Sequence, residues 1–133
     1  MEKRAIPFRE TRKIHKAVES AEDYTELIQD LIAENGKARI CDLAKKMGIS
    51  HVTVVNTVKR LIRDGYVVKN EDITLTEKGE KTARFSREKH QVLASFLRKL
   101  GVSESVIATD VEGIEHHISL ETLRAIEKFI AVF

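Results

Sequence analysis

The stretch ARICDLAKKMGISHVTVVNTVKRLIR, residues 38–63, decides the fold of this 133-residue chain. Apolar residues recur at helical spacing on both sides of Gly48, which predicts two amphipathic helices. Ala44, Gly48 and Val54 have the spacing of a helix-turn-helix. The small residue lets the second helix approach, the glycine makes the turn, and the apolar residue docks the second helix onto the first. Ser50 is suited to cap that second helix.

The flanking segments predict a winged form of this motif. Before it, apolar residues between Tyr24 and Ile32 predict a helix that is capped by Ser20 and ends at Asn35-Gly36. After it, two β-branched runs, separated by Asn70-Glu71, predict a small hairpin. The fold class is therefore mainly α, with a winged helix-turn-helix domain followed by an all-helical domain.

The second helix of the motif is the candidate recognition helix. Its amino-terminal residues would face base edges in the major groove, where Asn can pair with adenine and Thr or Val can contact a thymine methyl. Basic residues nearby suit phosphates, which provide affinity rather than sequence choice. The alternative is an ordinary surface on a protein-binding winged helix. The candidate DNA-binding residues are Arg39, Ser50, Val52, Thr53, Asn56, Lys59 and Arg60.

The rest of the chain predicts three more helices. The first is capped by Thr76 and runs to about Leu100, and the others cover about 103–117 and 119–133. We divide the chain into a basic extension over residues 1–20, a winged-helix domain over 21–86, and a helical domain over 87–133. The extension is expected to be a flexible arm or a partly helical segment.

Charge is distributed unevenly along the chain. Residues 1–100 carry 21 Lys and Arg against 15 Asp and Glu, whereas the last 33 residues carry 2 against 6. This predicts that residues 1–100 bind an anionic polymer and that the acidic last 33 residues bind a cation, although an uneven solvated surface is the alternative. The single cysteine, and the lack of a signal peptide or an apolar run of membrane-spanning length, predict a cytoplasmic protein.

A cluster of possible metal ligands lies in the acidic last 33 residues of the chain. Glu112, Glu115 and His116 stand at i, i+3 and i+4, so a helix would point all three to one side. Carboxylates with imidazole suit a divalent ion such as Mn²⁺ or Fe²⁺. Asp23 with Glu26, and His90, could complete a site. Taken singly, these three have other interpretations, which are a helix-dipole contact, a solvated acid and a paired histidine.

Together with the Leu75-Thr76-x-x-Gly79 motif that follows the predicted hairpin, these separated motifs resemble the diphtheria toxin repressor family, and within it the manganese transport regulators. The resemblance covers roughly residues 20–133. It implies that residues 87–133 form an all-helical metal-binding and dimerisation domain. It further implies a homodimer in which six residues of each subunit bind two manganese ions. It also implies that oxygen donors stand at Asp23 and Glu112, where the iron-responsive branch has methionine and cysteine, and we expect no third, SH3-like domain. The six implied ligands are Asp23, Glu26, His90, Glu112, Glu115 and His116.

The resemblance predicts a manganese(II)-responsive repressor of metal-uptake genes that binds a palindromic operator in double-stranded DNA. An iron(II)-responsive repressor of the same family, a metal-independent winged-helix module and a dinuclear metalloenzyme are the alternatives. The hairpin tip departs from the family pattern, because Asn70, Glu71 and Asp72 stand where an Arg-Gly is expected. The acidity of this tip therefore disfavours its contact with the minor groove.

Overall fold

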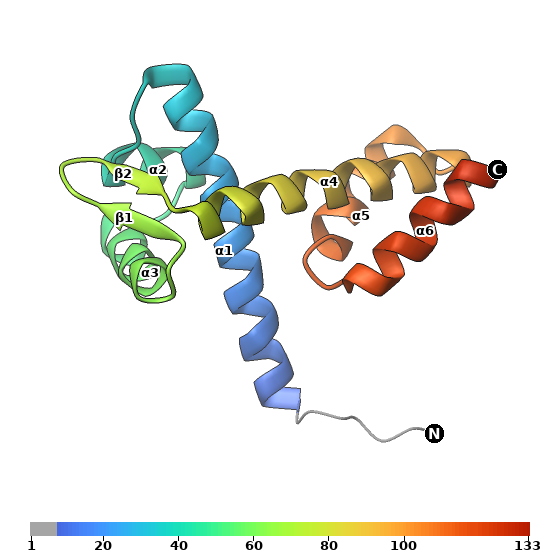
Figure 1. Ribbon diagram of the computed structural model, residues 1–133, viewed down its shortest axis with the longest axis horizontal. Helices are drawn as coiled ribbons and strands as arrows, with labels where there is room; N and C mark the ends of the chain where they lie inside the picture. The colour runs from blue at the N-terminus through green and yellow to red at the C-terminus, as the bar shows by residue number, and fades with distance from the viewer. Residues whose placement is uncertain (1–7) are drawn as a thin grey trace. The chain divides into compact units, whose positions relative to one another are not determined.

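The computed structural model describes the backbone of residues 8–133 and the side chains of residues 12–14 and 16–133. The prediction for residues 1–7 lies outside the described residues. Helices dominate, and two short strands pair as an antiparallel hairpin, so the predicted fold class is confirmed (Figure 1). In chain order the elements are α1 (Phe8–Asn35), α2 (Ile40–Met47), α3 (His51–Arg63), β1 (Val67–Lys69), β2 (Ile73–Leu75), α4 (Glu77–Lys99), α5 (Glu104–Ile114) and α6 (Leu120–Val132).

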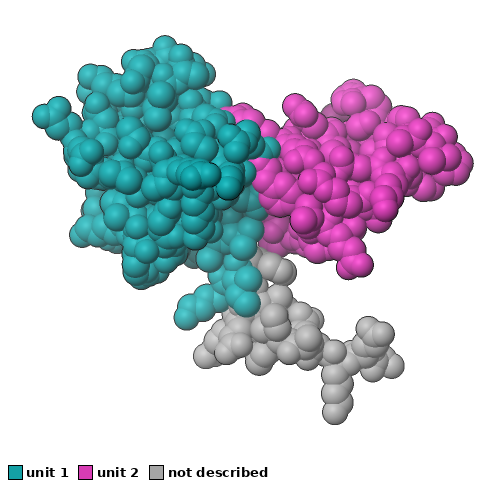
Figure 2. All heavy atoms as spheres, in the orientation of Figure 1, with its two compact units in different colours: residues 1–84 teal, residues 85–133 magenta. Residues whose placement is uncertain are grey.

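The chain forms two compact units, coloured separately in Figure 2. Unit 1 extends to Arg84 and unit 2 covers Phe85–Phe133, so α4 contributes its first two turns to unit 1 and the remainder to unit 2. Among the described residues, no helix is long and apolar enough to cross a bilayer.

Helix α1 begins earlier than the sequence predicted. The expected cap, Ser20, lies inside a continuous helix that starts at Phe8. Residues 9–19 consist largely of Arg, Lys, Glu and Ala, which favour a helix, and contain neither glycine nor proline. The predicted cap was wrong because the helical signal before Ser20 is strong in propensity although its apolar periodicity is weak.

The core of unit 1 gathers the apolar faces of α1, α2, α3 and the hairpin. Gly48 adopts the left-handed conformation, with φ of 67°, and its amide donates to the carbonyl of Ala44, which ends α2. Ser50 then accepts a hydrogen bond from the Thr53 amide and caps α3. Val54 is fully buried. The helix-turn-helix is thus built as its three signature residues predict.

The hairpin is held against the start of α4 by the Leu75-Thr76-x-x-Gly79 motif. In the hairpin Val67 pairs with Leu75 and Lys69 with Ile73. The Thr76 hydroxyl donates to the Gly65 carbonyl and accepts from the Gly79 amide. A Cβ at Gly79 would overlap the carbonyl oxygen of Tyr66. Glycine is therefore needed here for close approach, although its φ is negative.

Unit 2 packs α5 and α6 against the second part of α4. Leu93, Ile107 and Val111 form its buried apolar cluster. Ser119 caps α6 by accepting from the Thr122 amide. Arg124 of α6 pairs with Glu88 of α4, a contact that the sequence analysis did not anticipate.

Candidate metal centre and nucleic-acid interface

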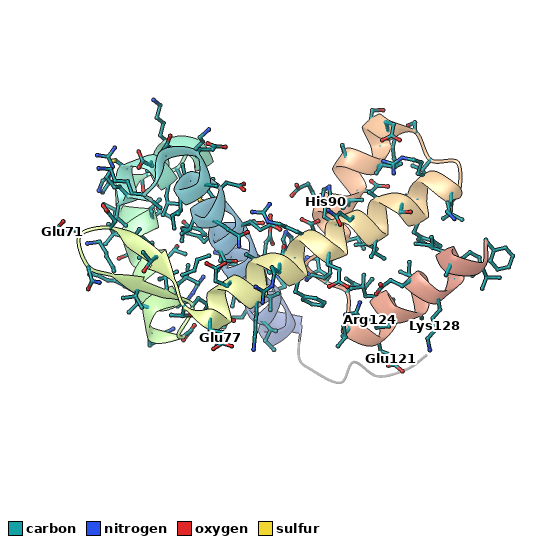
Figure 3. The ribbon with its side chains drawn as sticks, turned by 45° about the horizontal axis from the view of Figure 1, so that its top comes forward. Glu71, Glu77, His90, Glu121, Arg124 and Lys128 are labelled. Atoms are coloured by element: carbon teal, nitrogen blue, oxygen red, sulfur yellow. The ribbon has the colours of Figure 1, made fainter. Side chains whose placement is uncertain are left out.

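Glu112 and Glu115, at the end of α5, meet His90 of α4. Ligand atoms of the three side chains all lie within 4.8 Å of one another. Nδ1 of His90 is 2.8 Å from Oε2 of Glu115. Figure 3 shows His90 on the part of α4 that belongs to unit 2. The structure therefore brings together three of the six predicted ligands within one unit.

Glu115 is the buried member of this cluster. Its side chain is only 5% exposed, whereas His90 is about half exposed. Burial raises the pKa of Glu115, the hydrogen bond and charge of His90 lower it, and the nearby Glu112 carboxylate raises it again. The net effect is a raised pKa, so the buried carboxylate lacks sufficient compensating positive charge.

His116 is the fourth predicted ligand in unit 2. Its Nε2 atom lies 3.5 Å from Oε1 of Glu115, and its side chain is buried. The helix predicted to reach His117 ends at Ile114, and Glu115 is its cap. Glu115 and His116 therefore follow the last helical residue. Glu115 keeps right-handed helical backbone angles, which explains why it still shares a cluster with Glu112.

The remaining two predicted ligands belong to unit 1. Asp23 and Glu26 lie one turn apart on α1 and are both partly buried. Their spacing places the two carboxylates on neighbouring positions of one helix face. Their role as ligands stays a prediction.

The donor set of the unit 2 cluster fits a divalent metal ion. It offers carboxylate oxygens and imidazole nitrogens. The single cysteine, Cys41, is exposed on α2 in unit 1 and adds no thiolate to this cluster. Oxygen and nitrogen donors suit Mn²⁺ and also bind Fe²⁺. The two neighbouring carboxylates, of which that of Glu115 is buried, give the cluster a physical reason to hold a cation.

The first turns of α3 present the predicted base-contacting side chains. Val52 is 68% exposed, unusually open for an apolar residue, and Thr53 and Asn56 are also exposed. The hydroxyls of Ser50 and Thr53 lie 2.8 Å apart and bond to each other, so part of their capacity serves the helix cap. Of the exposed side chains in these turns, those of Val52 and Asn56 take no part in this cap.

The three predicted phosphate-binding residues differ in how available they are. Lys59 is exposed. Arg39 bonds to Asp42 at 3.2 Å, and this hydrogen bond lowers the pKa of the Asp42 carboxyl. The sequence signal for that pair is opposite charge three residues apart, with Arg39 at the cap and Asp42 in the first turn of α2. Arg60 is half-buried, and its Nη2 atom has no hydrogen-bond partner among the described residues.

Comparison with known proteins places this architecture in a family. Residues 16–74 match the "Iron dependent repressor, N-terminal DNA binding domain", and residues 76–133 match the "Iron dependent repressor, metal binding and dimerisation domain". The chain is 45% identical over 124 residues to transcriptional regulator MntR of Salmonella typhimurium, covering 92% of this chain and 78% of that protein. The chain belongs to the iron-dependent repressor family. It is a DNA-binding transcriptional regulator that forms a homodimer, and the metalloenzyme alternative is excluded.

Other similar proteins support the same family assignment. The HTH-type transcriptional regulator MntR of Lysinibacillus sphaericus is 42% identical over 115 residues, covering 85% of this chain and 83% of that protein. The structure of the manganese regulator SloR superposes with a TM-score of 0.73 at 29% identity over 84% of this chain. A manganese-dependent transcriptional repressor in complex with manganese superposes with a TM-score of 0.70 at 26% identity, also over 84%. This chain spans about half the length of those two solved chains, 53% and 52%.

Proposed function

We propose that this family member is a manganese(II)-responsive repressor of metal-uptake genes. The observation that carries the proposal is the cluster of His90, Glu112 and Glu115, whose buried carboxylate lacks enough positive charge. We propose the six predicted residues, including Asp23, Glu26 and His116, as ligands of two ions per subunit. Oxygen donors at Asp23 and Glu112 favour manganese over softer ions.

The proposed response depends on ligands that belong to both units. Asp23 and Glu26 are fixed on α1, which also forms part of the winged-helix core, whereas the other ligands belong to unit 2. When bound, the divalent cation supplies the positive charge that these carboxylates share. Without that charge, the clustered carboxylates repel one another, and the arrangement that brings the ligands together is not held. Binding that prefers one arrangement of the units shifts the population toward it.

We infer that the homodimer reads a palindromic operator in double-stranded DNA. Two-fold symmetry would present two α3 helices to half-sites about one helical turn apart, roughly 34 Å. Val52 and Asn56 would contact bases, and Lys59 would contact a phosphate. As a regulator of genes, the protein would act in the cytoplasm.

A DNA-binding titration tests this function. Purified protein is mixed with operator DNA in chelator, with Mn²⁺ and with Fe²⁺ under anaerobic conditions. Mn²⁺ should tighten binding by about 5- to 150-fold, as expected for a coupling of 1–3 kcal/mol. Equal affinity in all three conditions would favour the metal-independent module, and a response to Fe²⁺ alone would favour the iron-responsive alternative.

Variants connect the response to the cluster. Glu115→Ala should remove the Mn²⁺ effect while helical circular dichroism stays unchanged. Glu121→Ala is the matched control, because Glu121 is an exposed glutamate in the first turn of α6 in the same unit. An undiminished Mn²⁺ response in Glu115→Ala would show that the ligand assignment is wrong.

A further inference from the structure

The carboxyl end of α3 closes in a compact turn, residues 64–66, which we call the α3 corner. The Tyr66 amide donates to the Leu61 carbonyl at 2.9 Å, and the Gly65 amide donates to the Ile62 carbonyl at 3.1 Å. Gly65 adopts the left-handed conformation, with φ of 85°. These two bonds end the helix in a Schellman motif. The carbonyl of Asp64 lies beyond the last donor of the helix and takes a partner from outside it.

The first turn of α4 supplies that partner through Lys78. Its ammonium donates to the Asp64 carbonyl at 2.8 Å and lies 4.3 Å from the centroid of the Tyr66 ring. A cation is favoured both by the dipole at the carboxyl end of a helix and by the face of an aromatic ring. Lys78 occupies an unspecified position of the Leu75-Thr76-x-x-Gly79 motif, so the motif itself does not require this contact.

Two further residues at the start of α4 contact the same corner. The Thr76 hydroxyl donates to the Gly65 carbonyl at 2.6 Å. Gly79 lies so close to the Tyr66 carbonyl that a Cβ would not fit between them. All three attachments therefore join the end of α3 to one turn of α4. A change in the direction of that turn acts directly on α3.

Helix α4 also carries a proposed metal ligand. It is continuous from Glu77 to Lys99 and includes His90, twelve residues after Lys78. At a rise of about 1.5 Å per residue, the two lie roughly 18 Å apart along the axis. Lys78 is therefore too far from His90 to reach an ion that His90 binds. One continuous helix thus holds the recognition helix in unit 1 and presents a proposed ligand in unit 2.

We propose that Lys78 is a positioning residue that couples α4 to the recognition helix. The arrangement of α4 that Mn²⁺ favours then also fixes α3 for operator binding. The inference rests on the proposed function, because it takes Mn²⁺ as the effector and His90 as a ligand. Coupling between two sites requires an element that both sites bias, and α4 is that element. Loss of the Lys78 ammonium weakens the coupling and leaves each site intact.

The variant Lys78→Met tests the coupling, because it removes the ammonium and retains an unbranched side chain. The probe is a fluorescent duplex that the parent protein selects from random-sequence DNA in Mn²⁺. Anisotropy gives its dissociation constant in chelator and in saturating Mn²⁺. We expect the ratio of these two constants to fall by about three- to tenfold, the effect of losing one hydrogen bond.

The binding of Mn²⁺ provides a readout that a purely structural role would not change. Without DNA, the Mn²⁺ affinity of Lys78→Met should equal that of the parent. Linkage requires the coupling to be reciprocal. The duplex should therefore raise the Mn²⁺ affinity of the variant less than that of the parent, by the same factor as in the DNA titration.

Matched variants separate this contact from general charge effects. Lys81→Met is the control, because Lys81 is exposed one turn later on α4 and pairs with Glu77 of the same helix at 3.3 Å. It loses the same charge and should keep the ratio of the parent. Lys78→Arg should keep most of the ratio, because a guanidinium can also donate to the Asp64 carbonyl. Equal falls for Lys78→Met and Lys81→Met would contradict the proposal.

Three other outcomes would overturn the proposal. An equal loss of affinity in chelator and in Mn²⁺, with a weaker dependence on salt, shows that Lys78 contacts a DNA phosphate instead. A lower urea midpoint for Lys78→Met with an unchanged ratio shows that Lys78 only stabilises unit 1. A parent protein without any response to Mn²⁺ overturns the proposed function, and this inference with it.

Discussion

The two units bury apolar surface to very different extents. Among the described residues, eleven form the buried cluster of unit 1, whereas three form that of unit 2. Both units leave large apolar side chains exposed, and in unit 2 these include Leu120 and the aromatic rings of Phe129 and Phe133. It also places a buried carboxylate, Glu115, beside a second acid. Unit 1 is built to be stable by its own packing, and unit 2 is built to be completed by a partner and a cation.

This contrast explains why binding can control the protein. A small unit with few buried apolar residues gains little stability from packing alone. Binding to the folded state then contributes a large share of its stability through mass action. The winged helix, by contrast, needs a fixed internal geometry whatever the metal supply, because α3 must present the same side chains each time.

The largest expected effect comes from Gly79→Ala in unit 1. The added methyl would overlap the Tyr66 carbonyl and push the hairpin away from α4. It would also strain the hydrogen bond from the Gly79 amide to Thr76. We expect a loss of about 3 kcal/mol, at the upper end for overpacking, in urea unfolding.

The matched glycine in unit 2 should respond in the opposite direction. Gly113 lies within α5, and a Cβ there would meet nothing within 4 Å. Gly113→Ala should therefore stabilise the protein by about 0.5–1 kcal/mol through helix propensity. Similar destabilisation by both substitutions would contradict the view that unit 1 is tightly packed and unit 2 is open at this position.

The second effect concerns stability as a function of pH in the metal-free protein. The pKa of Glu115 is raised in the folded state, mainly by burial, so the folded state holds its proton more tightly than the unfolded state does. The stability that this tighter proton binding contributes is therefore complete below the pKa of an unfolded glutamate, about 4.3. It is lost as the pH rises through the higher pKa that Glu115 has in the folded state. Glu115→Gln should thus be more stable than the parent at neutral pH, by a margin that shrinks as pH falls.

Urea unfolding in chelator at several pH values measures this margin. Glu121→Gln, an exposed carboxylate, is the control and should change stability little at any pH. A Glu115→Gln variant that is less stable than the parent at neutral pH would mean that the bond to His90 outweighs the burial of the charge.

The sequence predicted most of unit 1 because its signals are local. Ala44, Gly48 and Val54 fix the turn, and the Leu75-Thr76-x-x-Gly79 motif fixes the hairpin, each through contacts between neighbouring elements. The beginning of α1 was missed because a helix can continue on propensity alone, past a residue that is suited to cap it. Capping residues mark where a helix is able to begin, but they do not require it to begin there.

The candidate site was predictable in composition but less so in geometry. The spacing of Glu112 and Glu115 indicated one face, and the structure joins them to His90. The end of α5 before Glu115 could not be predicted, because Ile114 and His116 carry no signal that terminates a helix. Nor could it show that Glu115 is buried while Glu112 is exposed, because burial depends on how α4 and α5 pack.

The third effect compares two helix caps. Ser50 accepts from the Thr53 amide in unit 1, and Ser119 accepts from the Thr122 amide in unit 2. Replacing either by Ala should cost about 1 kcal/mol in thermal unfolding. Only Ser50→Ala should also weaken operator binding, because that cap orders the first turn of the recognition helix. Equal loss of DNA affinity in both variants would show that unit 2 stability, and not the local order of α3, limits binding.

The smallest effect is expected at the tip of the wing. Glu71 is exposed in the loop between β1 and β2, where Figure 3 shows it at the end of the hairpin. A carboxylate beside a phosphate backbone is repelled, so Glu71→Lys should tighten operator binding by about threefold, and the effect should fade as salt screens the charge. Glu77→Lys is the control with the same change in charge, on an exposed residue at the start of α4 in the same unit. If fluorescence anisotropy shows equal gains for both, the wing has no special position near DNA, and only the net charge of unit 1 matters. A larger gain at Glu71 would place the wing tip near the DNA backbone and show that its acidic side chain weakens operator binding. The contacts that hold the protein on its operator would then come from α3.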